Sequence, residues 1–357
     1  MKFLIVKTSA IGDVLHAFPI IDYLMQRFPS AHIDWVVEKA SYPLLQSHPS
    51  IHRAFLIDTK KWRRSLLSKK TWQEIREFRK ALRKTTYDAV FDLQGNCKSA
   101  LMTWFARSKD KVGFGWHSVA EKPNLFVTRL RFDVAKDQNV RLRYLALLQQ
   151  YFKDQTLDGF CDQKVELRIQ QEEIHQLLAI LQLPTFKQRP CLMVAFGSRW
   201  PNKRLDQKIL EDFLTRIAAC FKTSFLFIYA DEKEQEEAYL LQKAFASHSA
   251  SVGMLSLPLL QRALASVDGL IAMDSAVLHL GAAAGVPTFS VFGPSSAAHY
   301  KPIGERHRAF SGQCPYGQTF ITRCPKLRTC STGACMQGVS AHELFESFRE
   351  FWQALQN

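Results

Sequence analysis

Short apolar runs alternate along the chain with longer segments in which apolar residues recur at helical spacing. The strand-length runs lie at 3–6, 33–37, 55–57, 87–93, 112–114, 192–196, 224–229, 269–273 and 286–292. Helical spacing occupies 14–24, 72–82, 99–106, 140–152, 172–181, 207–220, 234–245, 257–265, 277–284 and 341–355. Strands that alternate with helices in this way predict α/β architecture with parallel sheets.

The alternation is interrupted once, and this predicts two doubly wound, Rossmann-like domains. Residues 154–187 are mixed and polar, and proline stands at positions 184 and 190. We therefore expect an N-terminal domain over 1–165 and a C-terminal domain over 186–338. A final amphipathic helix, 339–357, is expected to pack back on the N-terminal domain. If the two domains face one another, the cleft between them is the default ligand site.

Residues 268–296 combine a strand, a tight loop, a small-residue helix and a second strand. Asp274, Ser275 and Ala276 follow the first strand directly. The amide groups at a helix start bind phosphate well, and ligands collect at the carboxyl ends of parallel strands. Two interpretations are open: a phosphate site, or an ordinary helix cap with His279 as a hydrogen-bonded histidine on the helix face.

Charge narrows the choice of partner. The 357 residues include 47 Lys and Arg against 33 Asp and Glu, a net charge of +14. This excess favours an anionic partner: nucleic acid, an anionic membrane or a phosphorylated substrate. The segment 59–70 surrounds Trp62 with Lys60, Lys61, Arg63 and Arg64, and Leu66 and Leu67 follow, which suits an amphiphilic anion. The alternative is a solvated, charged face.

No leader sequence or membrane span is expected. Met1 and Lys2 lead directly into the first strand-like run, and no apolar stretch approaches the ~20 residues that cross a bilayer. We expect a cytoplasmic protein that is held peripherally on the cytoplasmic face of the inner membrane.

The cysteines fall into two groups. Cys97, Cys161, Cys191 and Cys220 are scattered and are typical of small buried hydrophobic residues. Cys314, Cys324, Cys330 and Cys335 are close together, but their gaps do not form two C-x-x-C pairs. Plain thiols are therefore favoured over a structural metal site, and no metal or cofactor is predicted.

Two motifs carry a family resemblance. The start, FLIVKTSAIGDVLHAFP at 3–19, and DSAVLHLGAAAGVPTFSVFGPSS at 274–296 resemble the bacterial heptosyltransferases of glycosyltransferase family 9, with heptosyltransferase I the most similar subgroup. The pieces DWVVE at 34–38, YDAV at 87–90, DLQG at 92–95 and KSA at 98–100 extend the resemblance over nearly the whole chain. It implies a GT-B fold, two Rossmann-like domains, with the acceptor site in the first and the nucleotide-sugar site in the second. It also implies inverting, metal-independent transfer.

The resemblance assigns roles to individual residues. Asp13 matches the proposed catalytic base, and Ser9, Ala10 and Gly12 form its loop. Lys60, Lys61, Trp62, Arg63 and Arg64 lie in the half that binds the acceptor. The residues that match the donor site are Gly197, Ser198, Lys203, Arg204, Glu234, Leu255, Asp274, Ser275, Ala276 and His279.

The expected reaction moves heptose from ADP-L-glycero-D-manno-heptose to the Kdo region of lipid A in lipopolysaccharide core synthesis. Three alternatives stay open. The first is transfer of another sugar, because Ser275 and Ala276 stand where the family commonly has Thr and Gly. The second is a sugar-nucleotide epimerase of the same fold. The third is a basic polyanion-binding protein without catalysis, although no nucleic-acid-binding signature is visible and no nucleic acid partner is expected.

Overall fold

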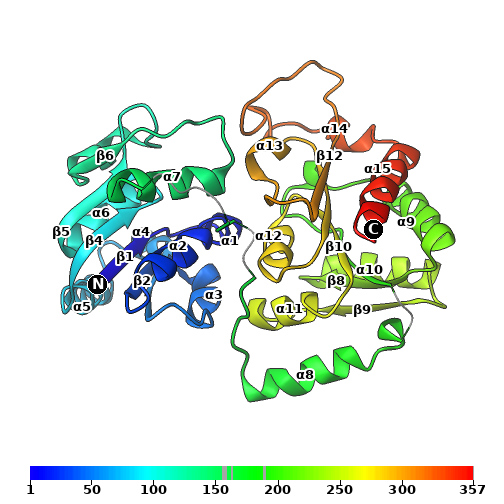
Figure 1. Cartoon of the computed structure of the whole chain (residues 1–357), viewed down its shortest axis with the longest axis horizontal. Helices are drawn as coiled ribbons and strands as arrows, with labels where there is room; N and C mark the ends of the chain where they lie inside the picture. The colour runs from blue at the N-terminus through cyan, green and yellow to red at the C-terminus, as the bar shows by residue number, and fades with distance from the viewer. Residues whose placement is uncertain (155–158, 162–163, 188–189, 357) are drawn as a thin grey trace. The chain divides into compact units, whose positions relative to one another are not determined.

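The computed structural model describes residues 1–154, 159–161, 164–187 and 190–356 (Figure 1). The chain divides into two compact units, Met1–Gln163 and Lys164–Asn357. The expected junction at 154–187 includes 155–158 and 162–163, which lie outside the described residues, as does Asn357 at the end of the expected last helix.

The N-terminal unit is built on a six-stranded parallel sheet in the order β3-β2-β1-β4-β5-β6. Its strands are β1 (Lys2–Val6), β2 (His32–Glu38), β3 (Arg53–Ile57), β4 (Thr86–Asp92), β5 (Arg107–Phe114) and β6 (Leu130–Phe132). Its helices are α1 (Ile11–Leu15), α2 (Pro19–Arg27), α3 (Tyr42–Gln46), α4 (Thr59–Arg64), α5 (Lys69–Leu82), α6 (Cys97–Phe105) and α7 (Val140–Phe152), with short 3-10 turns at Lys39–Ser41 and Lys122–Phe126.

The C-terminal unit repeats this topology, with a six-stranded parallel sheet in the order β12-β11-β10-β7-β8-β9. Its strands are β7 (Cys191–Ala195), β8 (Ser224–Tyr229), β9 (Ser249–Gly253), β10 (Gly269–Met273), β11 (Thr288–Phe292) and β12 (His307–Ser311). Its helices are α8 (Gln171–Leu181), α9 (Gln207–Phe221), α10 (Glu232–Ala244), α11 (Leu257–Leu264), α12 (Ala276–Ala283), α13 (Ala297–Tyr300), α14 (Ala334–Gln337) and α15 (Ala341–Ala354), with 3-10 turns at Pro184–Phe186 and η4 (Pro201–Lys203).

The central strands are buried on both faces, which explains why they read as continuous apolar runs. Every residue of β7, β10 and β11 is buried. The strands missing from the sequence prediction are β6, β9 and β12, and all three lie at a sheet edge. An edge strand needs less apolar surface, and β9 reads SASVG. Local hydrophobicity therefore could not reveal these three strands.

The first predicted helix is in fact two helices. α1 ends at Leu15 and α2 begins at Pro19, which stands in the first turn of α2. Proline lacks the amide hydrogen that a helix interior needs, but it fits a first turn. The predicted helix begins at residue 14, whereas α1 begins at Ile11. Asp13 therefore lies inside the first turn of α1.

The C-terminal helix α15 packs against the core of its own unit. Phe348 and Trp352 are buried in the same core cluster as Phe213 on α9 and Phe289 on β11. The Phe289 and Phe348 rings lie 5.4 Å apart. The apolar face of α15 is thus used to complete the core that supports the C-terminal sheet.

Candidate functional site

Each sheet has a switch point. This is the pair of neighbouring strands whose following helices lie on opposite faces of the sheet. In the N-terminal unit this point lies between β1 and β4, and in the C-terminal unit between β7 and β10. Loops diverge there at the carboxyl ends of the strands, and open parallel sheets bind ligands at this place. Most residues of the predicted site follow one of these four strands.

Asp13 lies in the first turn of α1, the helix that follows the loop after β1. Its Oδ2 accepts a hydrogen bond of 2.9 Å from the Ala10 amide, and its Oδ1 lies 4.0 Å from His16 Nδ1. Ala10 is the N-cap of α1, and the Asp13 side chain reaches back to it from inside the first turn. Its side chain is 27% exposed. One carboxylate oxygen thus organises the loop, while the group remains accessible.

A hydrogen-bonded chain ties this loop to β2, β3 and β4. Lys98, at the start of α6, donates to Ser9 Oγ at 3.3 Å and to Glu38 Oε1 at 3.1 Å. Glu38 in turn accepts hydrogen bonds from the amide and hydroxyl of Thr59, where α4 begins. Gln94 accepts from the amides of residues 8 and 9. Sequence reasoning did not name Lys98 and Glu38 as site residues. Glu38 ends β2 and Lys98 lies in the first turn of the helix after β4, and this position was the available signal.

The basic segment 59–70 is largely helical, and Trp62, which lies on α4, is buried. Trp62 is buried in the N-terminal core, with its ring 6.0 Å from that of Phe78. Its indole nitrogen donates to Glu74 at 3.2 Å, and Lys61 pairs with the same carboxylate at 2.5 Å. The other five cations of the segment are exposed: Lys60, Arg63, Arg64, Lys69 and Lys70.

In the C-terminal unit, Lys203 and Asp274 meet at the switch point. Lys203 ends η4, which follows β7, and Asp274 follows β10. Lys203 Nζ and Asp274 Oδ2 lie 2.5 Å apart, and both side chains are almost buried. The sequence places these residues far apart, so only the pairing of β7 with β10 brings them together.

Ser275 and Ala276 form the start of α12 beside this ion pair. Ser275 is the N-cap, yet its side chain makes no capping bond, and its buried Oγ has no hydrogen-bond partner among the described residues. A buried, unpaired hydroxyl at a helix N-terminus is a suitable donor for an anionic oxygen. His279, one turn further on, is buried.

The other predicted donor residues lie on the neighbouring loops. The Glu234 carboxylate lies against Gly197, where an added Cβ would be only 2.1 Å from Glu234 Oε1. Ser198 Oγ accepts from the Trp200 amide at 3.4 Å. Arg204 pairs with Glu237 on α10, so its charge is partly neutralised.

Leu255, one of the residues that match the donor site, is partly buried in the loop between β9 and α11. It therefore lies at the carboxyl edge of the C-terminal sheet, like the loops that carry Gly197 and Asp274.

Over the described ranges, no group of three or more His, Cys, Asp or Glu side chains is arranged to hold a metal ion. None of the helices in the part of the chain that the structure describes is long and apolar enough to cross a membrane.

Two sheets of the same Rossmann-like order, each with polar side chains at its switch point, define the GT-B class of glycosyltransferases. Residues 75–328 match the model of glycosyltransferase family 9 (heptosyltransferase), and the chain belongs to that family.

The curated relatives of the chain include two heptosyltransferases. It is 29% identical over 301 residues to lipopolysaccharide heptosyltransferase 1 of Escherichia coli strain K12, covering 83% of this chain and 88% of that protein. It is 28% identical over 298 residues to the Pseudomonas aeruginosa protein of the same name, covering 83% and 79%.

Among solved structures, E. coli heptosyltransferase WaaC with ADP-2-deoxy-2-fluoro heptose matches with a TM-score of 0.76. The match covers 98% of this chain and 99% of that one at 24% identity, and it supports the fold.

Proposed function

We propose that this protein transfers heptose from ADP-L-glycero-D-manno-heptose to the Kdo region of lipid A, with inversion at the anomeric carbon and without a metal ion. The proposal rests on membership of the family and on relatives named lipopolysaccharide heptosyltransferase 1. The observation that carries it is the Lys203–Asp274 pair beside the unpaired Ser275 hydroxyl.

The C-terminal unit is proposed to bind the donor. A diphosphate needs cations and amide donors, and Lys203 and the first turn of α12 supply both. Asp274 holds the Lys203 ammonium in place before the donor binds and then accepts hydroxyl groups of the sugar. As the bond between the anomeric carbon and the diphosphate breaks, Lys203 compensates the negative charge that develops on the departing ADP.

The N-terminal unit is proposed to bind the acceptor and to supply the base. The acceptor hydroxyl attacks the anomeric carbon, ADP departs, and Asp13 takes the proton of that hydroxyl. Ser9, Ala10 and Gly12 shape the loop around it. Lys98 adds a cation 3.3 Å from Ser9 Oγ, suited to a carboxylate of the acceptor.

The exposed part of α4 and the following corner fit the headgroup of an anionic lipid. Lys60, Arg63 and Arg64 supply cations, and Leu67 and Trp72 are exposed at 102% and 59% beside them. Apolar side chains among cations favour the surface of an anionic membrane, where the acceptor resides. We therefore place the enzyme peripherally on the cytoplasmic face of the inner membrane.

A donor screen with a Kdo–lipid A acceptor, read by mass spectrometry, tests this proposal. The expected product carries one added heptose, with an α or β linkage opposite to that of the donor. Transfer of a hexose instead would favour the alternative donor. Absence of transfer, together with retention of generic DNA in a gel at physiological salt, would favour the polyanion-binding alternative.

A further inference from the structure

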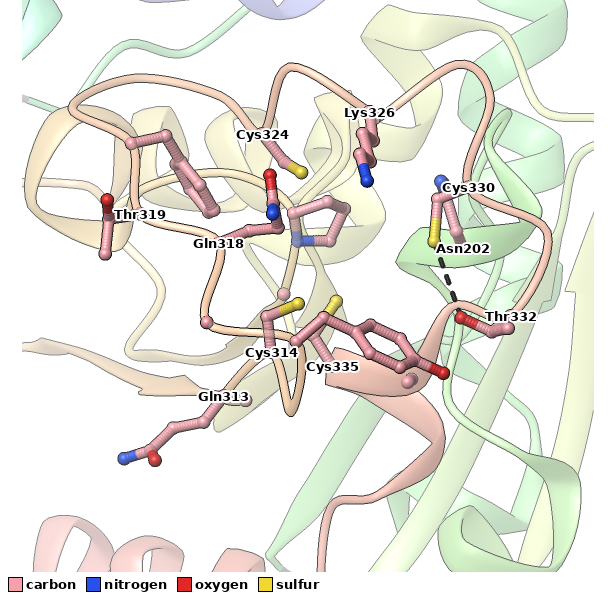
Figure 2. A pocket seen from close by; sticks show the side chains of 17 residues that line it. Asn202, Gln313, Cys314, Gln318, Thr319, Cys324, Lys326, Cys330, Thr332 and Cys335 are labelled. Atoms are coloured by element: carbon pink, nitrogen blue, oxygen red, sulfur yellow. Dashed lines mark hydrogen bonds between the residues drawn. The ribbon is translucent and has the colours of Figure 1, made fainter.

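The segment between β12 and α15 has four cysteines around one cavity (Figure 2). Between Gly312 and Gly338 the only helix in this described stretch is α14, which has four residues. The cavity measures about 310 Å³. Cys314 follows β12, Cys324 and Cys330 come from the long loop, and Cys335 lies on α14, so thiols reach the cavity from several directions.

The lining of the cavity has the chemistry of a thiolate site. Its ionisable groups are the four thiols, the phenol of Tyr316 and the ammonium of Lys326, without a carboxylate or imidazole. Soft thiolate ligands favour ions such as zinc over magnesium or calcium. The Thr332 hydroxyl lies 3.6 Å from Cys330 Sγ and lowers the pKa of that thiol, whereas burial raises the pKa of Cys335.

We propose that Cys314, Cys324, Cys330 and Cys335 bind one soft divalent metal ion, with zinc as the natural occupant, and that this ion fixes the segment. As described, the sulfur atoms surround the cavity without converging, and no three of them are placed to hold an ion. Metal binding would draw them inward to about 2.3 Å from zinc. Metal sites commonly form together with their local fold. Lys326 would offset part of the excess negative charge of four thiolates.

The segment contacts the turn that carries Lys203, so the ion would also steady the donor site. The Asn202 side chain donates to the Leu327 carbonyl at 2.6 Å, and a Cβ on Gly333 would lie 3.3 Å from Asn202 Cα. Asn202 directly precedes Lys203 in η4. This consequence rests on the proposed donor-binding role of Lys203, whereas metal binding itself does not.

Metal analysis of the full chain, purified under argon, tests the proposal. We expect about one zinc ion per chain in a four-thiolate site. After chelation, titration with Co²⁺ should produce sulfur-to-cobalt charge-transfer absorption and the visible bands of a tetrahedral site. Cys324→Ser and Cys330→Ser should each weaken Co²⁺ binding by about 10-fold or more. The matched control is Cys97→Ser with Cys220→Ser, both exposed cysteines outside the cavity, and it should bind like wild type.

Wild-type protein that contains no stoichiometric metal and shows no thiolate absorption with Co²⁺ would overturn the proposal, whatever the variants do. Equal Co²⁺ binding by wild type and by folded Cys324→Ser and Cys330→Ser variants would overturn it too. The thermal midpoint and the affinity for ADP are measured with and without metal. If metal binds but leaves ADP affinity unchanged, the link to Lys203 is wrong. If metal binds and no heptose is transferred, the metal site stands and the proposed function fails.

Discussion

The carboxylate of Asp13 both holds a loop in place and stays accessible for its proposed role as the base. Its Oδ2 accepts from the Ala10 amide and so holds the loop after β1, and the group keeps 27% of its side chain exposed. The sequence could identify Asp13 through its motif, but only the structure shows that it lies inside the first turn of the helix.

Asp13→Asn should lower kcat by about 10²–10⁴-fold, because the amide keeps the size of the side chain but cannot accept the proton. Donor affinity and the thermal midpoint should stay close to wild type, since an amide oxygen can still accept from Ala10. ADP release with a Kdo acceptor measures kcat, and Asp212→Asn, on the exposed face of α9, is the control. A variant with nearly normal kcat would show that another group is the base.

Lys203→Ala should reduce turnover by about 10²-fold or more, because the substitution removes a cation from the developing charge on the leaving diphosphate. It also leaves Asp274 without the ion pair of 2.5 Å, so donor binding should weaken as well. Single-turnover rates and ADP titration separate the two effects. Lys208→Ala, an exposed lysine in the first turn of α9, is the matched control. Full activity that depends on added Mg²⁺ would contradict the proposed role.

At the scale of elements, α4 and α5 form an amphipathic corner of the N-terminal unit. Trp62 and Phe78 face the core, while Leu67 and Trp72 stay exposed. The Trp72 indole donates to the Leu66 carbonyl at 2.7 Å and closes the turn between the helices. The composition of this segment indicates cations around apolar side chains, but it cannot tell that Trp62 is buried and Trp72 exposed, because helical phase decides which side of a helix faces the core.

Replacing Arg63 and Arg64 together with Gln should raise the acceptor KM while leaving ADP affinity unchanged. Arginine pairs with phosphate and carboxylate through two hydrogen bonds, and screening by salt should shrink the difference from wild type. The measurement is initial rate against acceptor concentration at low and high salt.

Lys84→Gln with Arg107→Gln gives the matched control for this pair. It removes the same charge at the opposite end of the strands, before β4 and at the start of β5. An equal rise in KM for both double variants would show that net charge, and not the α4 surface, recruits the acceptor.

At the scale of the whole molecule, the stability of the fold depends on buried ionisable groups. Burial raises the pKa of Asp22, on α2, to about 7. The native state therefore binds a proton that the unfolded chain has already lost near its usual value of 3.8. The stabilisation from this group is complete below about pH 4 and is lost as the pH rises towards 7, by about 1.4 kcal/mol per pH unit within that window.

Asp22→Asn should remove this dependence. The variant should match wild type near pH 4 and exceed its thermal midpoint above pH 7, because no buried carboxylate has to ionise. Thermal unfolding from pH 4 to 8.5 measures the difference, and Asp212→Asn should follow wild type throughout. A constant difference at all pH values would mean that Asp22 does not titrate in this range.

The sequence by itself determined the alternation of elements, the two Rossmann-like domains and the family. These follow from local features: β10 and β8 match the predicted runs residue for residue because buried parallel strands must be continuously apolar. Motif residues such as Asp13 and Asp274 could also be named from sequence, because each belongs to a motif that follows a central strand.

The tertiary structure alone decided what depends on distant partners. Lys203 and Asp274 meet because β7 pairs with β10, and Lys98 joins Ser9 and Glu38 because β4 and β2 flank β1. The edge strands β6, β9 and β12 form because each pairs with a neighbouring strand, and not because their own residues are strongly apolar. Trp62 is buried and Trp72 is exposed because only one side of α4 and of α5 faces the core. Pairing, register and burial are long-range properties of the chain, and a local pattern cannot contain them.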